Sequence, residues 1–362
     1  MSKYISLVVI VLSLLGAGCS NILANNIKAE PVRFNHPDEY VSGLGFMALA
    51  DRRIFAVMAF ANAMGYDNEA EGTQMHPVRI KVRKLLSGNL VNQPKKVKAW
   101  RQYYETRKLA IFQYQNYALS LSTDWPFRRI RTDSELGYSI TAKRLKDFPA
   151  ILNDFCLTVK LDEIWSKVKA DYVVEIKKYN IDGMQQQMDF LWEYLRMERQ
   201  DTLTLVNVPN LLDTHYHAIG APYENYYYTV ESPGSHAYGL NTHEYLHSIV
   251  NPLVIASTVE ADNELFDYYE AGKEKPIVQT YRDPATFTFE CLVRALDIRI
   301  RVLLTDDPAY RKLIEDRVNE LTEQGLTLTR AFYNLLADYE QSEQSFDHFV
   351  PIMLQELPAY KQ

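Results

Sequence analysis

The sequence contains little cysteine. Three cysteines occur among 362 residues, Cys19, Cys156 and Cys291, and none of them lies in a Cys-x-x-Cys pair. A scaffold held together by several disulfides is therefore excluded, and at most one disulfide, between Cys156 and Cys291, can form. The core must be held by its own packing.

The sequence also lacks an excess of positive charge. Its 39 basic and 46 acidic residues give a net charge of −7, and the densest basic run is the short stretch QPKKVKAWR at 93–101. Nucleic acid is not an expected partner, because its binding rests largely on neutralised phosphates. The 47% hydrophobic and 23% charged residues are typical of a globular chain that can bury one large core or two smaller ones.

The apolar run at the N-terminus is too short for a comfortable membrane span. Ile5 to Leu15 follows Lys3 and has roughly 11 residues, against the roughly 20 of a membrane helix. Residues 16–18 are Gly-Ala-Gly and lead into Cys19. This ending resembles a bacterial lipoprotein signal, which implies export, acylation of Cys19 and a membrane anchor in the bacterial envelope. Leu15 lies one position further from Cys19 than usual, so simple secretion and an uncleaved anchor stay as alternatives.

Helical patterns dominate the rest of the chain. We expect a signal peptide at 1–19, a linker at 20–32, a helical N-terminal region at 33–200 and a catalytic region at 201–362. The first helical pattern begins near Pro37 and extends to about Tyr66, because proline and two acids are typical of a first turn and an apolar stripe follows. Further helices are predicted at 94–121, 141–152, 159–177, 181–199, 242–250, 254–271, 284–304, 308–323, 326–341 and 345–357.

Two strands are predicted between these groups of helices. TLTLVNVPNLL, at 202–212, alternates apolar and polar residues, and ENYYYTVESPGS, at 224–235, is rich in tyrosine and ends in a turn. The expected fold class is α+β and predominantly helical, with a small sheet that precedes the helix at 242–250.

That helix carries the most specific pattern in the chain, His243-Glu244-x-x-His247. Residues four apart share one face of a helix, so both imidazoles can bind a single ion. Zinc takes imidazole nitrogen readily, and a catalytic site has three protein ligands and one open position. Glu244 could then act as the general base for a zinc-activated water. The alternative is an amphipathic core helix with two satisfied histidines.

The third ligand must come from elsewhere in the chain. Glu290 lies in a predicted helix that begins near Pro284, in a polar stripe that continues through Arg294, Asp297 and Arg301. Acid-to-arginine spacings of four are also typical of a solvated face with ion pairs, so spacing alone leaves the choice open. The rival ligands are Glu260, Asp262, Glu264 and Asp267. Arg294 could orient Glu290 as a supporting group.

A resemblance favours Glu290. HEYLHSIVNPL, followed by ECLVRA, resembles the gluzincin zinc metallopeptidases, whose third ligand is a glutamate on a later helix. It is more closely similar to an uncharacterised family of exported bacterial proteins with His-Glu-x-x-His-Ser-x-x-Asn-Pro-Leu and Glu-x-Leu-Val-Arg-Ala motifs. The resemblance covers residues 200–304 and implies a zincin-like core with His243, His247 and Glu290 as zinc ligands.

The resemblance further implies that the strand before the active helix, here Asn225 to Glu231, pairs along its edge with the substrate backbone, although it could equally be a strand that covers the core. A donor to the developing oxyanion is also expected. The sequence does not choose among its candidates, which are His236, Tyr238, Tyr281 and His348. His215 and His217 share one face of a strand and could bind metal, but strand-end histidines without metal are the commoner case.

The function these patterns predict is that of a zinc-dependent metallopeptidase of the bacterial envelope, with a peptide or protein as substrate. One alternative is a lipoprotein without activity whose metal site is structural. Another is a zinc amidase that acts on cell-wall material.

Overall fold

The computed structural model describes residues 40–43, 46–67, 74–131, 139–199, 204–215, 217–223, 226–235, 240–257, 262–281 and 283–357. The chain forms two compact units. The N-terminal unit contains the described residues up to Ile181 together with Leu205–Tyr238, and the C-terminal unit contains Asp182–Thr204 and Gly239–Gln362. Helices predominate in the described part, as predicted, and the strands form a small mixed sheet that precedes the histidine-bearing helix in the sequence.

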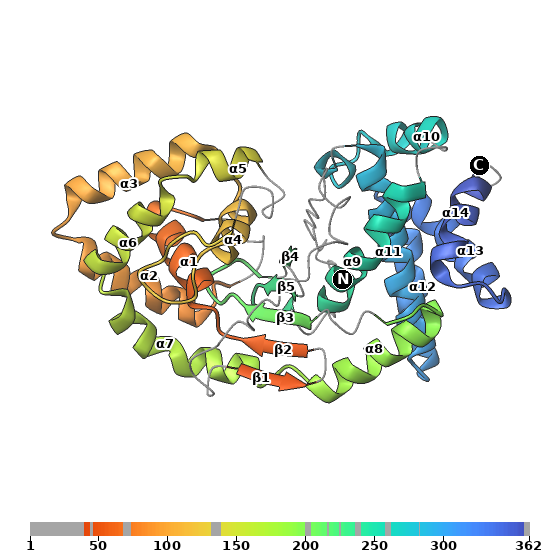
Figure 1. Ribbon diagram of the computed structural model, residues 1–362, viewed down its shortest axis with the longest axis horizontal. Coiled ribbons are helices and arrows are strands. Elements are labelled where there is room, and N and C mark those ends of the chain that lie inside the picture. Colours follow the sequence, from red (N-terminus) through yellow and green to blue (C-terminus); the bar gives the residue numbers. More distant parts are fainter. Residues whose placement is uncertain are drawn as a thin grey trace, which may run out of the picture. The chain divides into compact units, whose positions relative to one another are not determined.

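The N-terminal unit is built around helix α1 (Arg52–Met64), drawn in red and orange in Figure 1. Asp51 caps it by accepting hydrogen bonds from the amides of Arg53 and Ile54, and Gly65 ends it in the left-handed region at φ 101°. Nearly every position of α1 is buried, because helices pack on several of its sides. These helices are α2 (Pro77–Leu90), α3 (Pro94–Arg107), α4 (Ile111–Leu119) and α6 (Phe148–Thr158); α5 (Ser139–Arg144) and α7 (Leu161–Ile176) complete the unit.

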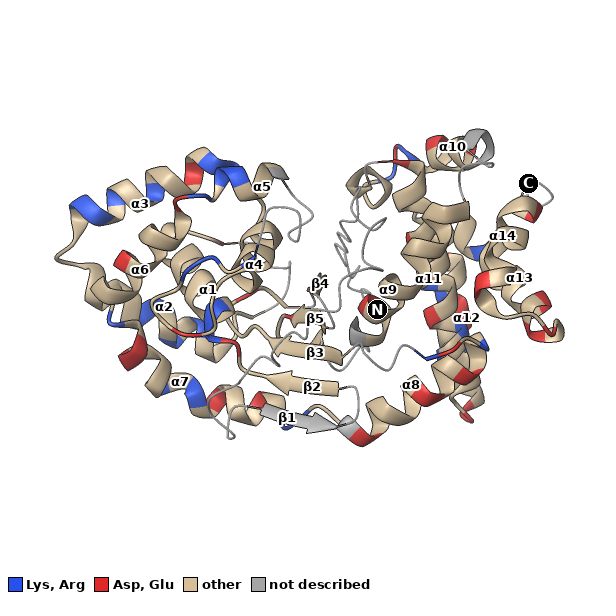
Figure 2. Ribbon diagram, viewed as in Figure 1, with Lys and Arg blue, Asp and Glu red and all other residues tan. Residues whose placement is uncertain are grey.

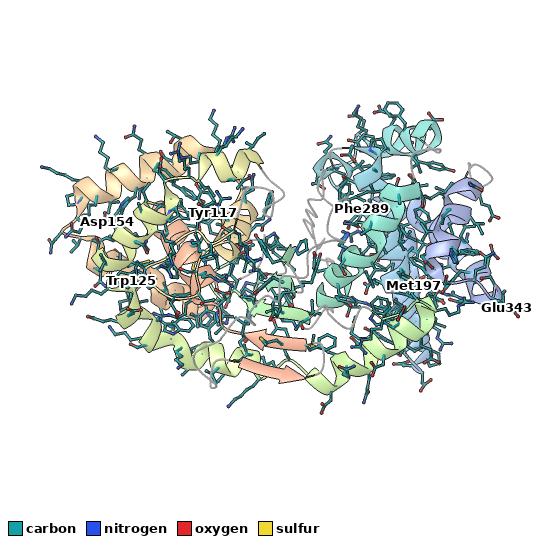
Figure 3. The ribbon with its side chains drawn as sticks, viewed as in Figure 1. Tyr117, Trp125, Asp154, Met197, Phe289 and Glu343 are labelled. Carbon is teal, nitrogen blue, oxygen red and sulfur yellow. The ribbon has the colours of Figure 1, made fainter. Side chains whose placement is uncertain are left out.

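Aromatic rings fill the core around α1. Phe60 lies edge-on to Phe148 and Phe155, with ring centroids 5.2 and 5.3 Å apart. Phe55 lies 4.9 Å from Trp165. Tyr117, labelled in Figure 3, is fully buried in the same core. Offset and edge-to-face pairs of this kind add to the free energy gained by burying the rings.

The sheet has five strands in the order β1-β2-β3-β5-β4. Their bounds are β1 (Tyr40–Gly43), β2 (Phe46–Leu49), β3 (Thr204–Pro209), β4 (Ala218–Tyr223) and β5 (Tyr226–Glu231). β3 and β5 confirm the two predicted strands. β2 pairs in parallel with β3, whereas β1 with β2 and β4 with β5 are antiparallel. β5 lies between β3 and β4, so the expectation that this strand offers a free edge to a substrate is wrong.

The first helix begins later than predicted. Residues 40–43 form β1 and residues 46–49 form β2, so the helix predicted to begin near Pro37 is wrong at these residues. Gly43 and Gly45 disfavour a helix here, and β2 gains hydrogen bonds by pairing with β3. The capping carboxylate of Asp51 then fixes the true start at Arg52.

Other differences from the sequence prediction are local. α2 and β4 were not predicted: in α2, apolar residues alternate with Arg79, Lys81 and Arg83, which imitates a strand, and β4 contains a glycine and a proline. The predicted helix at 94–121 is divided into α3 and α4, since Lys108 adopts a left-handed conformation at φ 49°. The helix predicted at 141–152 is divided into α5 and α6.

The predicted boundary at 200–201 differs from the division into units. β3, β4 and β5 belong to the N-terminal unit, because β2, from residues 46–49, pairs with β3. The C-terminal unit is helical. It contains α8 (Ile181–Leu195), α9 (Leu240–Ser257), α10 (Asp262–Gly272), α11 (Pro284–Leu303), α12 (Pro308–Glu323), α13 (Leu328–Gln341) and α14 (Phe346–Glu356).

The predicted signal peptide, linker and Cys19 lie outside the described residues. Within the described part, no helix is both long and apolar enough to cross a membrane. Cys156 and Cys291 are both buried and free, so the disulfide left open by the sequence does not form. The basic run at 93–101 lies on α3, blue in Figure 2, where Lys96 pairs with Asp154 at 2.5 Å.

Glu231, at the end of β5, is a buried carboxyl in the N-terminal unit. Tyr179 donates a hydrogen bond to its Oε2 at 3.2 Å and Thr229 to its Oε1 at 3.0 Å. Burial nevertheless raises the pKa of Glu231 to about 7, although the two hydrogen-bond donors act to lower it. The charge of Glu175 adds a smaller raising effect. The folded state therefore binds a proton that the unfolded chain releases near pH 4.5.

The pKa of Glu231 is higher in the folded state than in the unfolded chain. Its contribution to stability is therefore fully present below pH 4.5 and is lost as the pH rises through about 7. Between pH 4.5 and 8 we therefore expect Glu231 to cost the N-terminal unit on the order of 3 kcal/mol of unfolding free energy. Glu231→Gln should remove this loss, measured by urea denaturation across that range, while Glu105→Gln on α3 should retain it. Identical pH profiles for the wild type and Glu231→Gln would contradict the assignment.

Candidate metal centre

Helix α9 presents two imidazoles one turn apart. His243 and His247 are 4% and 1% exposed, and Glu244 between them is fully buried. The helix continues to Ser257, beyond the end predicted near residue 250. Pro252 lies inside it, so proline here did not end the helix as expected. The histidine rings meet edge to face, with centroids 4.9 Å apart.

Helix α11 supplies the carboxylate. Asp283 caps it by accepting a hydrogen bond from the Thr286 amide at 2.7 Å, and Pro284 occupies the first turn as predicted. The helix packs against α9, α10, α12 and α13, and this surrounds it on most sides. Glu290 is fully buried and Arg294 is 7% exposed. The alternative that these two residues belong to a solvated, ion-paired face is therefore wrong.

Three possible ligand groups converge between α9 and α11. The Nε2 atoms of His243 and His247 lie 3.3 Å apart. Glu290 Oε2 lies 3.4 Å from His247 Nε2, and Glu290 Oε1 lies 3.6 Å from His243 Nε2. In the described part of the chain this is the one group of three or more His, Cys, Asp or Glu side chains whose ligand atoms are close enough to share an ion.

The charges of His247 and Glu290 suit a cation. Burial lowers the pKa of His247 to about 4, although the charge of Glu290 acts in the opposite direction, so the imidazole is neutral at pH 7. For Glu290, burial acts to raise the pKa, but the guanidinium of Arg294 and the two imidazoles outweigh it and hold the pKa at about 2. A neutral imidazole and an ionised carboxylate are the forms that bind metal.

Arg294 and Tyr281 both interact electrostatically with Glu290. Arg294, four residues along α11, forms an ion pair with Glu290, with Nε 2.7 Å from Oε1. Tyr281 is 3% exposed. Burial, with the charge of Glu290, raises its pKa, and the guanidinium of Arg294 opposes this. The predicted pairing of Arg294 with Glu290 is thus present, and Tyr281 is the one oxyanion candidate in electrostatic contact with this group among the described residues.

The separations fit a tetrahedral ion. Ligand atoms at roughly 2.0 to 2.1 Å from a common centre are about 3.3 to 3.4 Å apart in tetrahedral geometry. The distances of 3.3, 3.4 and 3.6 Å are close to this spacing, with the second ending on Oε2 of Glu290 and the third on Oε1. Neither oxygen of Glu290 accepts a hydrogen bond of good geometry from the described residues. Two imidazoles and a carboxylate form an appropriate ligand set for zinc and for several other divalent ions.

None of the remaining candidates whose side chains the structure describes joins this group. His236 and Tyr238 lie outside the described residues, as does Glu260, and the side chains of Asp262 and Glu264 are not described. Asp267 is exposed on α10. His348 is exposed on α14, where its Nδ1 lies 3.1 Å from Ser345 Oγ.

His215 and His217 precede β4 in the N-terminal unit. His217 Nδ1 lies 3.5 Å from the buried carboxylate of Asp213, and the ring of His215 lies 6.4 Å from that of His76. Neither belongs to a group of metal-binding geometry in the described part of the chain. The metal-free interpretation of these two histidines is the one the geometry favours.

Two further residues contact the histidines. Asn251 lies four residues after His247 on α9, and its Oδ1 is 3.0 Å from His247 Nδ1. Phe289, labelled in Figure 3, packs edge-on to the His247 ring with centroids 6.0 Å apart. The spacing of four between His247 and Asn251 was a signal for the first contact, whereas the second depends on how α9 and α11 pack.

Comparison of the chain with family models, with curated proteins and with solved structures found no match. The site therefore has to be judged on its own geometry. That geometry is a buried His-His-Glu group consistent with a zincin-like metal site.

If these residues bind zinc, metal should stabilise the C-terminal unit. At zinc concentrations about 100 times Kd the expected gain is about 2.7 kcal/mol, or roughly 5 to 10 °C in Tm. His243→Ala should lose this shift because it removes one ligand. Asp267→Asn, which changes the exposed rival carboxylate on α10, should retain it. An unchanged zinc-dependent shift in His243→Ala, measured by calorimetry, would exclude the proposed ligand.

Proposed function

We propose that this protein is a zinc-dependent hydrolase of the bacterial envelope that cleaves peptide bonds. The observation that carries the proposal is the convergence of His243, His247 and Glu290, buried and at separations that suit a tetrahedral ion. Three protein ligands leave one position of such an ion for water or substrate, which is the pattern of catalytic rather than structural zinc.

Each residue has a defined task in this proposal. His243, His247 and Glu290 would hold the ion, while the ion pair with Arg294 fixes one oxygen of the Glu290 carboxylate. A bound zinc ion supplies Lewis acidity, which lowers the pKa of water and polarises a carbonyl. Glu244 accepts the proton of the attacking water and returns it to the leaving amine. Tyr281 is the proposed donor to the oxyanion.

The order of the motifs supports peptide-bond hydrolysis. His-Glu-x-x-His on one helix, followed by a glutamate ligand on a later helix, resembles the gluzincin peptidases. Zinc as the metal, a peptide as the substrate and membership of the uncharacterised exported family rest on this resemblance. The buried triad supports the ligand set alone.

The proposal predicts the effect of Glu244→Gln. This change retains the size of the side chain and removes the base, so hydrolysis of a peptide library should fall by about 100- to 10,000-fold while zinc content is unchanged. The measurements are cleavage by mass spectrometry and zinc by atomic emission. Glu343→Gln, at an exposed position, is the matched control and should cleave as the wild type does.

Two results would contradict parts of the proposal. Full cleavage activity in Glu244→Gln would exclude it as the base. Cleavage of a peptidoglycan digest, with no peptide of the library cut, would identify a cell-wall amidase instead of a peptidase.

We also propose that Cys19 is acylated after export, on the resemblance of residues 1–19 to a lipoprotein signal. Cys19→Ala should then no longer be labelled by an alkyne fatty acid. The protein should appear either in the soluble fraction or as the uncleaved precursor. Labelling that persists in Cys19→Ala would contradict the assignment.

A further inference from the structure

The second ring nitrogen of His247 has a partner of its own. His247 Nδ1 lies 3.0 Å from Oδ1 of Asn251, one turn later on α9. Both residues are buried, with exposures of 1% and 0%. The contact therefore lies away from water, where a polar interaction is strong and where an unmade one is costly.

The chemistry of this contact determines where the imidazole proton lies. With the amide oxygen of Asn251 turned toward the ring, His247 Nδ1 carries the hydrogen and donates it, because a carbonyl oxygen only accepts hydrogen bonds. In a neutral imidazole, Nε2 then holds the free lone pair. Nε2 is the atom that lies 3.3 Å from His243 Nε2 and 3.4 Å from Glu290 Oε2. The nitrogen that faces the site is thus the one left free to bind an ion.

Asn251 has no other evident structural task. Its Nδ2 is buried and makes no hydrogen bond with the described residues. A buried amide with an unsatisfied donor destabilises a fold relative to an apolar side chain of the same shape. Among the described residues, the one hydrogen bond of the Asn251 side chain is the contact with His247.

We propose that Asn251 is a positioning residue that holds His247 as the Nδ1–H tautomer, in one ring orientation, and so presents Nε2 to the metal. The proposal rests on the proposed metal-binding function. Asn251 acts through His247. Loss of a partner of this kind lowers metal affinity by about 10- to 100-fold.

The test compares Asn251→Leu, which removes the acceptor at similar volume, with Asn251→Asp, which keeps an oxygen acceptor. In metal-free protein labelled with 15N-histidine, long-range 1H–15N spectra report the tautomer of His247. The wild type and Asn251→Asp should show Nδ1–H, and Asn251→Leu should show Nε2–H. Zinc affinity, measured by competition with a chelating indicator, should fall about 10- to 100-fold in Asn251→Leu and recover most of this loss in Asn251→Asp.

A structural role predicts a different result. It would lower the Tm of metal-free Asn251→Leu and leave the tautomer of His247 and the zinc affinity of the folded protein unchanged. Asn334→Leu, at an exposed position on α13, is the matched control and should leave tautomer, affinity and fold unaltered. The proposal is overturned if Asn251→Leu keeps either the Nδ1–H tautomer or the zinc affinity of the wild type.

The proposed hydrolase activity and the proposed role of Asn251 can be contradicted independently of each other. A wild type that binds zinc but cleaves no substrate would overturn the proposed hydrolase, while the tautomer and affinity differences would still support the role of Asn251. A wild type with Nδ1–H at His247 and an unchanged tautomer in Asn251→Leu would overturn the positioning role, even if the protein is an active zinc peptidase.

Discussion

The charge of Glu290 is buried between α9 and α11, and the C-terminal unit depends on how that charge is compensated. A carboxylate with no exposure to water is costly unless opposite charge or donors surround it. Arg294 provides the opposite charge from the same helix, and two imidazoles face the carboxylate from the other. The packing of α10, α12 and α13 on α11 supplies the apolar burial against which this cost is set.

Each of the two helices of the site carries one residue that holds a ligand group in place. On α11, the ion pair with Arg294 holds Oε1 of Glu290, and Oε2 lies nearest to His247. On α9, Asn251 holds the outer nitrogen of His247. Each of these supports lies four residues from the group it holds, so the helical repeat that places the ligands also places their partners. A short motif can therefore encode both the ligands and part of their support.

More of the site than of the fold could be predicted from the sequence. His243 and His247 follow from a local spacing, but Glu290 did not follow from spacing alone, because acid-arginine pairs four apart occur on solvated and on buried helices alike. α11 is buried because α9, α10, α12 and α13 pack against it, and these contacts cannot be read from the spacing of its own residues. β1 and β2 were missed since β2 pairs with β3, more than 150 residues later in the sequence, and β1 pairs with β2. Whether β5 lies at an edge of the sheet depends in the same way on β4. That strand was not predicted because it contains a glycine and a proline.

The central claim is that His243, His247 and Glu290 bind one zinc ion. X-ray absorption at the zinc edge tests it most directly, on protein that has been stripped of metal and reloaded with one equivalent. The account predicts a shell of nitrogen and oxygen at roughly 2.0 to 2.1 Å with the outer-shell scattering of two imidazoles, reduced to one in His243→Ala. A spectrum without imidazole scattering, or one that is unchanged in His243→Ala, would contradict it.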